Sequence, residues 1–133
     1  MINKIRVVLI DDNEFDLFLM EKLLKIKEIS SSVIKFSYAA NALEHLNRCD
    51  VSEWPQLIIL DIHMPVMNGF EFLKEYENFP EQKKESCLIV MVSSSLDQND
   101  NKNAVDNPAV HALLNKPLSM DELLKLLNEK GLH

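Results

Sequence analysis

The chain is poor in several residue types and segments that mark particular classes of protein. Its 133 residues include only two cysteines, two glycines and one tryptophan. No stretch approaches the roughly 18 consecutive apolar residues of a membrane span, so we expect no membrane helix. The short apolar N-terminal stretch lacks a small-residue cleavage site, so we expect no secretory signal. Cys49 and Cys87 are not spaced like metal ligands, and we expect reduced thiols in a cytoplasmic protein.

Positive charge is also scarce. Fourteen Lys and Arg residues stand against 21 Asp and Glu residues, which gives a net charge of -7. This balance argues against non-specific binding to nucleic acid or to anionic membranes. It leaves room for a protein partner with a basic or apolar patch. With 47% hydrophobic residues, no internal repeat and no low-complexity linker, residues 1–133 suit a single domain with a real core.

The chain does contain a regular alternation of apolar runs and helix-like segments. The runs, which we expect to be strands, are Ile5–Ile10, Val33–Phe36, Leu57–Leu60, Leu88–Val92 and Val110–Leu114. The expected helices are Glu14–Ile26, Ala42–Leu46, Phe70–Tyr76, a polar segment over Asp97–Val105, and Met120–Leu127. Most runs are continuous rather than alternating, as in strands that are buried on both faces. This order predicts an α/β fold, a doubly wound five-stranded parallel sheet with helices on both faces.

Several residues mark the expected boundaries of these elements. Asn41 can cap the second helix, and Ser119 with Glu122 forms a capping box for the last one. Pro108 ends the polar fourth segment, which reads equally well as a solvated turn or as a marginal helix. Gly69 is expected to provide a backbone turn that other residues would strain.

Charged and polar residues follow the apolar runs. Asp11 and Asp12 close the first run and Asp61 closes the third, while Ser93 follows the fourth and Lys116 the fifth. Ligands of doubly wound sheets bind outside the carboxyl ends of the strands, so these residues should meet on one rim. Three carboxylates in one place would repel each other unless a cation lay among them. The sequence therefore predicts a divalent cation site.

This rim has the groups that phosphoryl transfer requires. Mg²⁺ prefers a few carboxylates and often completes its shell with phosphate oxygens; Mn²⁺ is an alternative. Lys116 adds a positive charge and Ser93 adds a hydroxyl donor, which together can stabilise charge on the equatorial oxygens of the phosphoryl group. The nucleophile would then be a carboxylate that forms an aspartyl phosphate.

Four motifs carry a resemblance to a known family. They are LIDDNE at 9–14, LDIHMPVMNG at 60–69, VSSS at 92–95 and NKP at 115–117. Over essentially its whole length, the chain resembles the receiver domain of a bacterial two-component response regulator, of the single-domain type similar to the chemotaxis regulator. The resemblance implies a flavodoxin-like strand order of 2-1-3-4-5. It also implies a stand-alone signalling protein without an output domain, not an enzyme.

The resemblance implies a role for each residue of the metal site. Asp61 would be the phosphoacceptor, and Asp11 and Asp12 would hold Mg²⁺ together with it. The main-chain carbonyl of His63 would complete the protein ligands. We expect the His63 side chain to lie at the mouth of the pocket and not to bind the metal, because a lone histidine is a weak motif.

The resemblance assigns further residues to the phosphoryl group and its signal. Ser93 would bond a phosphoryl oxygen and move on phosphorylation, and Lys116 would pair with the phosphate. Pro117 would follow Lys116 through a cis peptide bond, a form of low cost only before proline. Leu113 occupies a position where the family has Tyr or Phe, so this chain lacks the aromatic ring of the family's switch.

The first helix is unusually apolar and leaves two interpretations open. The residues expected on its core face are Leu19, Met20, Leu23 and Leu24. Leu17 and Phe18 would then point toward solvent. They are either stray exposed apolar residues, which are common, or a docking patch for a helical kinase or phosphotransfer partner.

Three functional hypotheses follow. The first is a phosphoacceptor that receives its phosphoryl group from a sensor histidine kinase or histidine phosphotransfer protein and signals by binding a downstream protein, as a monomer or weak homodimer. The second is a phosphorylation-independent interaction module on the same fold. The third is a haloacid-dehalogenase-like phosphatase, but that family needs Asp-x-Asp on its first strand, which Asp11-Asp12-Asn13 does not supply.

Overall fold

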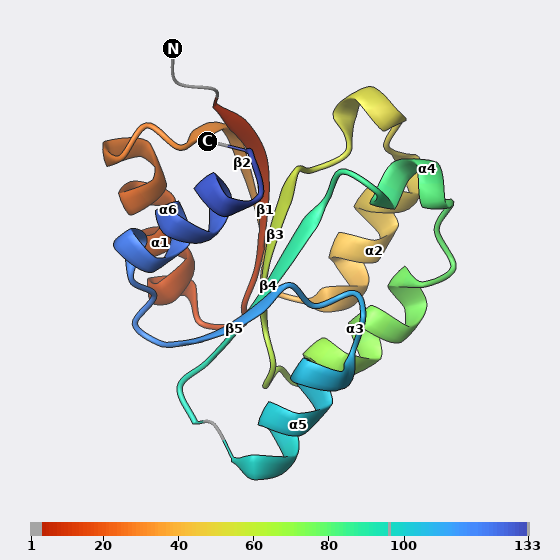
Figure 1. Cartoon of the computed structure of the whole chain (residues 1–133). Helices are drawn as coiled ribbons and strands as arrows, with labels where there is room; N and C mark the ends of the chain where they lie inside the picture. Colours follow the sequence, from red (N-terminus) through yellow and green to blue (C-terminus); the bar gives the residue numbers. More distant parts are fainter. Residues whose placement is uncertain (1–3, 96, 133) are drawn as a thin grey trace.

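The computed structural model describes residues 4–95 and 97–132. It confirms the predicted α/β fold, with five strands in one parallel sheet of order β2-β1-β3-β4-β5 (Figure 1). The strands are β1 (Ile5–Ile10), β2 (Ser30–Phe36), β3 (Leu57–Asp61), β4 (Leu88–Ser93) and β5 (Ala112–Asn115). All five run in the same direction, so their carboxyl ends meet along one edge, toward the bottom of Figure 1.

Helices cover both faces of the sheet. On one side lie α1 (Glu14–Ile26) and α6 (Met120–Glu129) (Figure 1). On the other side lie α2 (Ala39–Arg48), α3 (Gly69–Tyr76), α4 (Glu81–Lys84) and α5 (Gln98–Asp106). The short α4 and the 3₁₀ turn η1 (Val51–Glu53) were not expected, because neither segment has an apolar periodicity.

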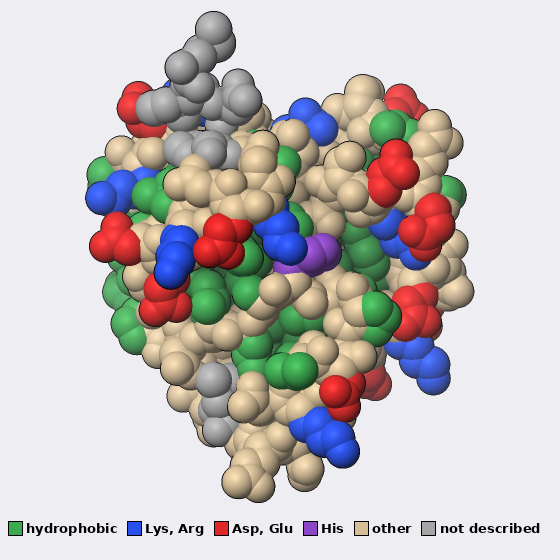
Figure 2. Space-filling model, viewed as in Figure 1, with side chains coloured by type: hydrophobic (Ala, Val, Ile, Leu, Met, Phe, Trp, Pro, Cys, Tyr) green, Lys and Arg blue, Asp and Glu red, His purple; other side chains and the backbone are tan. Residues whose placement is uncertain are grey.

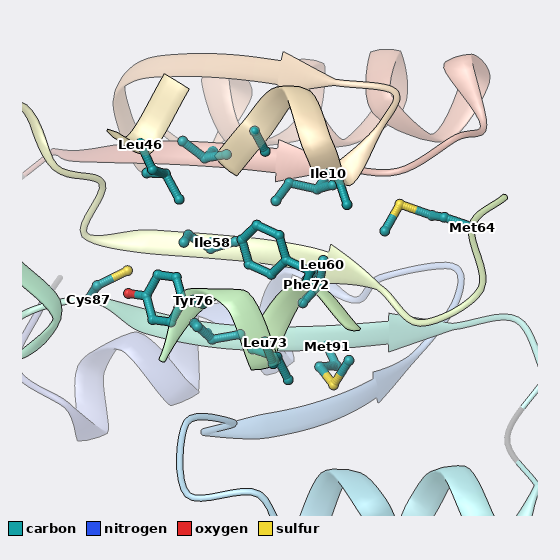
Figure 3. Close-up of a cluster of buried hydrophobic side chains, with 14 of the residues drawn as sticks. Ile10, Leu46, Ile58, Leu60, Met64, Phe72, Leu73, Tyr76, Cys87 and Met91 are labelled. Atoms are coloured by element: carbon teal, nitrogen blue, oxygen red, sulfur yellow. The ribbon is translucent and has the colours of Figure 1, made fainter. Parts of the chain in front are cut away.

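The continuous apolar strands are explained by this two-sided cover. Every residue of β3 and of β4 is buried, since each strand packs against helices on both faces. Figure 3 shows one of the two resulting clusters, in which Phe72 of α3 lies beside Ile58 and Leu60 of β3. Each such side chain contributes about 1.5–3 kcal/mol through burial. The core therefore holds the carboxyl ends of the strands in a fixed arrangement.

Three expected element starts are wrong. The second strand begins at Ser30 and not at Val33. The fifth strand begins at Ala112 and not at Val110, because the Val110 amide donates instead to the Asn107 carbonyl in a turn. The second helix begins at Ala39, so Asn41 lies within its first turn and does not cap it. At α6 the expected cap is present, since the Glu122 amide donates to Ser119 Oγ at 3.3 Å.

The orientation of α1 also differs from the expectation. Leu17, which we expected at the surface, is only 5% exposed and packs in the core with Met20 and Leu24. Leu19, expected in the core, is half-buried. Apolar residues lie on nearly every side of this helix, so the sequence pattern does not determine which side faces the sheet. Phe18 is exposed as expected.

Gly69 is required for a reason other than the one expected. Its backbone has no left-handed conformation, and it begins α3 directly beside the end of β3. A Cβ atom at this position would lie 2.7 Å from the main-chain oxygen of Asp61 and 2.7 Å from the Met91 methyl group. The glycine therefore allows α3 to approach the backbone at Asp61 closely.

From the sequence we expected no membrane helix and two reduced thiols. Across residues 4–95 and 97–132, no helix combines the length and apolar character that crossing a membrane requires. Cys49 and Cys87 are both buried free thiols. Burial raises the pKa of the Cys87 thiol to about 12, and burial together with nearby Glu53 raises the pKa of Cys49.

Candidate functional site

Three carboxylates meet at the carboxyl edge of the sheet. Asp11 directly follows β1, and Asp61 is the last residue of β3, the neighbouring strand. Asp11, Asp12 and Asp61 each offer a carboxylate oxygen, and these oxygens lie within 4.8 Å of one another. Asp11 and Asp61 are buried, whereas Asp12 is exposed. The structure thus brings together the acidic residues that the sequence pattern placed on one rim.

Local hydrogen bonds fix the orientation of the two buried carboxylates. The Asn13 amide donates to Asp11 Oδ1 at 2.9 Å, and Asn13 itself caps α1 by accepting a bond from the Asp16 amide. The His63 amide donates to Asp61 Oδ1 at 3.3 Å. In each case the second oxygen, Oδ2, faces the space between the strands' ends that Lys116 enters.

Lys116 provides the positive charge of this cluster. Its Nζ lies 2.7 Å from Asp11 Oδ2, 3.0 Å from Asp16 Oδ2 and 3.4 Å from Asp61 Oδ2. The Lys116 amide donates to the Ser93 carbonyl at 2.9 Å, which ties the residue after β5 to the end of β4. The Lys116–Pro117 peptide bond is cis, as the resemblance implies. One ammonium group is therefore shared by three carboxylates.

Sequence reasoning missed Asp16. It lies in the first turn of α1, and no strand pattern points to it. The available signal is its position in the first turn of the helix that follows β1, shortly after Asp11 and Asp12. Of the three carboxylates on Lys116, Asp16 belongs to a helix, whereas the other two follow or end strands.

The electrostatics of the cluster favour an added cation. Burial and the neighbouring charge of Asp11 raise the pKa of Asp61 to about 7, although Lys116 opposes the shift. Burial disfavours the charged form of Lys116, but its ion pairs with Asp11 and Asp16 outweigh this and raise its pKa. Asp11 Oδ2 is buried and, among the described residues, forms no well-aligned hydrogen bond. A buried carboxylate oxygen without a well-aligned hydrogen bond is a suitable ligand for Mg²⁺, which prefers hard oxygen ligands.

Ser93 lies at the end of β4, next to β3 in the sheet, and is fully buried. Its hydroxyl donates to the Ser95 carbonyl at 2.9 Å and accepts from the Ser95 amide at 3.1 Å. The hydroxyl is therefore engaged with the following loop. Within the described part of the chain it makes no hydrogen bond to Asp61.

His63 connects the site to α5. Its side chain is half exposed, and Nε2 lies 2.9 Å from Asp100 Oδ2 in the first turn of that helix. The Asn-rich segment is indeed a helix, capped by Asp97, whose side chain accepts from the Asp100 amide at 2.7 Å. Only Ala104 of α5 is buried, while Val105 is 75% exposed. The helix is thus held by its cap and a few contacts more than by apolar packing.

Leu113 lies in the middle of β5, opposite Met91 of β4. It is half-buried and packs against the core cluster on the α3 side of the sheet. Its side chain fills part of the space between the strand and the helices. A leucine supplies packing there but neither a ring nor a hydroxyl.

The outer side of α1 carries an apolar surface that we call the α1 aromatic patch, formed by Phe15 and Phe18. These side chains are 68% and 56% exposed. The ammonium of Lys22 lies 5.6 Å from the centre of the Phe18 ring. In Figure 2, apolar side chains reach the surface between charged ones on the side of the molecule covered by α1 and α6.

The fold and site define a doubly wound α/β domain with an acidic cluster and a lysine at the carboxyl edge of its sheet, where such folds bind their ligands. Within that class, the chain belongs to the response regulator receiver domain family, whose model matches residues 7–128. The family predicted from the motifs is confirmed. Receiver domains are signalling modules of two-component systems that accept phosphoryl groups, bind Mg²⁺ through acidic residues, and interact with histidine kinases or phosphotransfer proteins and with downstream targets.

Individual relatives agree with this assignment. The chain is 30% identical over 134 residues to the two-component response regulator ARR17 of Arabidopsis thaliana, covering 95% of this chain and 84% of the relative. A response regulator receiver protein of Dyadobacter fermentans has a similar structure, with a TM-score of 0.86, 37% identity, and coverage of 93% and 95%. A two-component response regulator of Cytophaga hutchinsonii matches with a TM-score of 0.83, 28% identity, and coverage of 95% and 96%.

Proposed function

We propose that this receiver domain accepts a phosphoryl group on Asp61, in a Mg²⁺-dependent reaction, from a phosphohistidine of a sensor kinase or phosphotransfer protein in the cytoplasm. It then signals by binding a downstream protein. The observation that carries the proposal is the cluster itself. Asp61 is buried at the end of β3, within reach of two further carboxylates and of the Lys116 ammonium.

The proposed reaction uses Asp61 as the nucleophile. A carboxylate oxygen of Asp61 attacks phosphorus, and a P–O bond forms as the P–N bond to the donor imidazole breaks. The electron pair of the broken bond stays on the imidazole nitrogen, which then takes a proton. Lys116 balances the charge that spreads over the phosphoryl oxygens during transfer.

Asp11, Asp12 and Asp61 would hold the Mg²⁺ ion, with the main-chain carbonyl of His63 as a further ligand; Mn²⁺ could replace it. When bound, the ion supplies positive charge that offsets repulsion among the carboxylates and the phosphoryl oxygens. Asp11 is suited to this role because its Oδ2 is buried and lacks a well-aligned hydrogen bond among the described residues. The exposed Asp12 can reach the ion from the solvent side.

Ser93 would provide the switch. To bond a phosphoryl oxygen, its hydroxyl must leave the Ser95 backbone, with which it makes two hydrogen bonds. Phosphorylation would therefore exchange those two bonds for one to a charged acceptor, which is stronger than a neutral one. Ser95 and the start of α5 would move as a result. The faces of β4, α5, β5 and α6 are the proposed output surface.

The partner that donates the phosphoryl group would dock on the α1 aromatic patch. Phe18 is exposed and is joined by Phe15, whereas Leu17, the other residue considered for docking, is buried. We expect Phe15→Ser with Phe18→Ser to slow transfer from a phosphorylated partner. Ile26→Ser, at an exposed apolar residue near the far end of α1, is the matched control. Labelling by a small phosphodonor should be unchanged, and an equal loss with both donors would disprove docking.

A phosphorylation-independent interaction module is the second candidate. Leu113 favours it, because a leucine in β5 supplies packing but not the aromatic ring of the family's switch. The clustered carboxylates and Lys116 favour the first candidate, since a scaffold requires none of them.

The test is the intact mass of the protein after incubation with a small phosphodonor, with and without Mg²⁺. We expect one labile phosphoryl group in the wild type, only with Mg²⁺, and none in Asp61→Asn. Cation binding measured on the same samples serves as the control. A wild type that binds the ion but never gains a phosphoryl group would refute the proposal and favour the interaction module.

A further inference from the structure

Lys116 occupies an oxygen that the proposed cation needs. Asp11 Oδ1 is already engaged by the Asn13 amide, so the oxygen left for a cation is Oδ2. That oxygen lies 2.7 Å from Lys116 Nζ, and the Asp61 oxygen on the same side lies 3.4 Å from it. A divalent ion among these carboxylates would repel the ammonium at such distances. The ammonium must therefore move, yet stay close enough to meet a phosphoryl group.

Asp16 offers the place to which the ammonium can withdraw. Its Oδ2 accepts a hydrogen bond of 3.0 Å from Lys116 Nζ, whereas the shorter contact with Asp11 lacks hydrogen-bond geometry. The Asp16 side chain is 29% exposed and lies at the solvent edge of the cluster, outside the three grouped carboxylates. Its position is fixed by the cap of α1, because the Asp16 amide donates to Asn13.

We propose that Asp16 is a positioning residue for Lys116: it retains the ammonium at the edge of the site when a divalent cation takes Asp11 and Asp61. This proposal rests on the proposed Mg²⁺-dependent function. Without Asp16, the ammonium has only Asp11 and Asp61 as partners and competes with the ion for both. Asp16 thus acts through Lys116 and not as a ligand of the ion.

The experiment is a calorimetric titration of the metal-free protein with MgCl₂ at fixed ionic strength. Asp16→Asn should bind Mg²⁺ about threefold more weakly than the wild type, the size expected for losing one partly exposed ion pair. Asp16→Glu, which keeps the carboxylate, should restore most of the affinity. Thermal unfolding of each variant verifies that it is folded, and the partly exposed position of Asp16 favours this.

Two comparisons separate positioning from a simple loss of negative charge. Glu14 is the other acidic residue in the first turn of α1 and is exposed, so Glu14→Gln removes the same charge nearby. It should change the affinity less than twofold. In a Lys116→Met background, Asp16→Asn should also have an effect of less than twofold, because the residue through which Asp16 acts is missing.

The outcomes distinguish this inference from the function on which it rests. An equal loss of Mg²⁺ affinity with and without Lys116 would show that Asp16 acts only by its charge, and would overturn the positioning role. Wild-type affinity in Asp16→Asn would overturn it as well. If the wild type gives no Mg²⁺ binding at all, the proposed metal-dependent function fails, irrespective of Asp16.

Discussion

The two ends of the sheet bury different kinds of side chain, although the same strands form both ends. At the carboxyl end lie the buried polar and charged residues among the described part of the chain, namely Asp11, Asp61 and Ser93. At the amino end, Trp54 precedes β3 and packs with Tyr76 and Phe79, with ring centroids 6.2 and 5.1 Å from its own. One end gathers ionisable groups whose charged forms burial disfavours, and the other gathers aromatic rings whose burial is favourable. Stability and chemistry are thus segregated along the strands.

Disrupting the aromatic cluster at the amino end of the sheet should cause the largest loss in the free energy of unfolding. Trp54→Ala removes a side chain that is 2% exposed, so we expect a loss of about 3–5 kcal/mol in the free energy of unfolding. Urea unfolding followed by far-UV circular dichroism measures it. Val105→Ala, at an exposed residue of α5, should cost less than about 0.5 kcal/mol. A loss under about 1 kcal/mol in Trp54→Ala would mean that the aromatic cluster does not anchor the fold.

Gly69→Ala tests the boundary between the core and the site. The added methyl would lie 2.7 Å from the Asp61 main-chain oxygen, so α3 or the end of β3 must shift. We expect a loss of about 1–3 kcal/mol in unfolding free energy and a slower phosphorylation of Asp61. Val105→Ala, at an exposed residue of α5 away from the core, is the control. Unchanged stability in Gly69→Ala would show that the start of α3 can shift to accommodate the methyl group without a loss of stability.

Removing a charge from the carboxyl end should stabilise the protein. The pKa of Asp61 is raised in the folded state to about 7, so the folded protein binds this proton more tightly than the unfolded chain. The ionised form therefore costs stability increasingly as pH rises from about 4 to about 7, and the cost is absent below that window. Asp61→Asn should raise stability by on the order of 1 kcal/mol at pH 7.5 and have little effect at pH 4.

Metal-free urea unfolding at the two pH values measures this difference. Asp12→Asn, which changes an exposed carboxylate of the same cluster, should give a smaller change. A destabilised Asp61→Asn at pH 7.5 would mean that its contact with Lys116 outweighs the burial of its charge.

The smallest expected effect is on tryptophan fluorescence. Trp54 lies before the amino end of β3, whereas Asp61 is the last residue of that strand. Because the two residues lie at opposite ends of β3, Mg²⁺ bound near Asp61 should leave the Trp54 emission nearly unchanged. Fluorescence titration with MgCl₂ measures this, and urea unfolding of the same sample provides the positive control. Strong quenching by the ion would show that the two ends of the sheet are coupled.

Features that follow from local runs of apolar residues were predicted from the sequence. Features that depend on contacts between residues far apart in the sequence were missed. Continuous apolar runs specify β3 and β4, because strands covered on both faces have no polar positions. The strand ends then placed the three aspartates together. In contrast, α4 is four residues long and has no apolar pattern to detect.

Two errors on α1 have the same physical origin. Its apolar residues lie on several sides, so the side that faces the sheet is decided by packing, and Leu17 was placed wrongly. The contact of Asp16 with Lys116 joins residues that are 100 positions apart. Such a contact follows from how the helix docks and not from any local spacing.

The burial of both thiols has a practical consequence for spectroscopy. Cys49 and Cys87 lie in the core with raised pKa values, and reagents that attack thiolates will find little to react with. A cysteine introduced at Val105, on the exposed side of α5, would therefore accept a fluorophore or spin label without removal of the native thiols. The wild-type core thus allows motion of a single helix to be recorded in real time in an otherwise unaltered molecule.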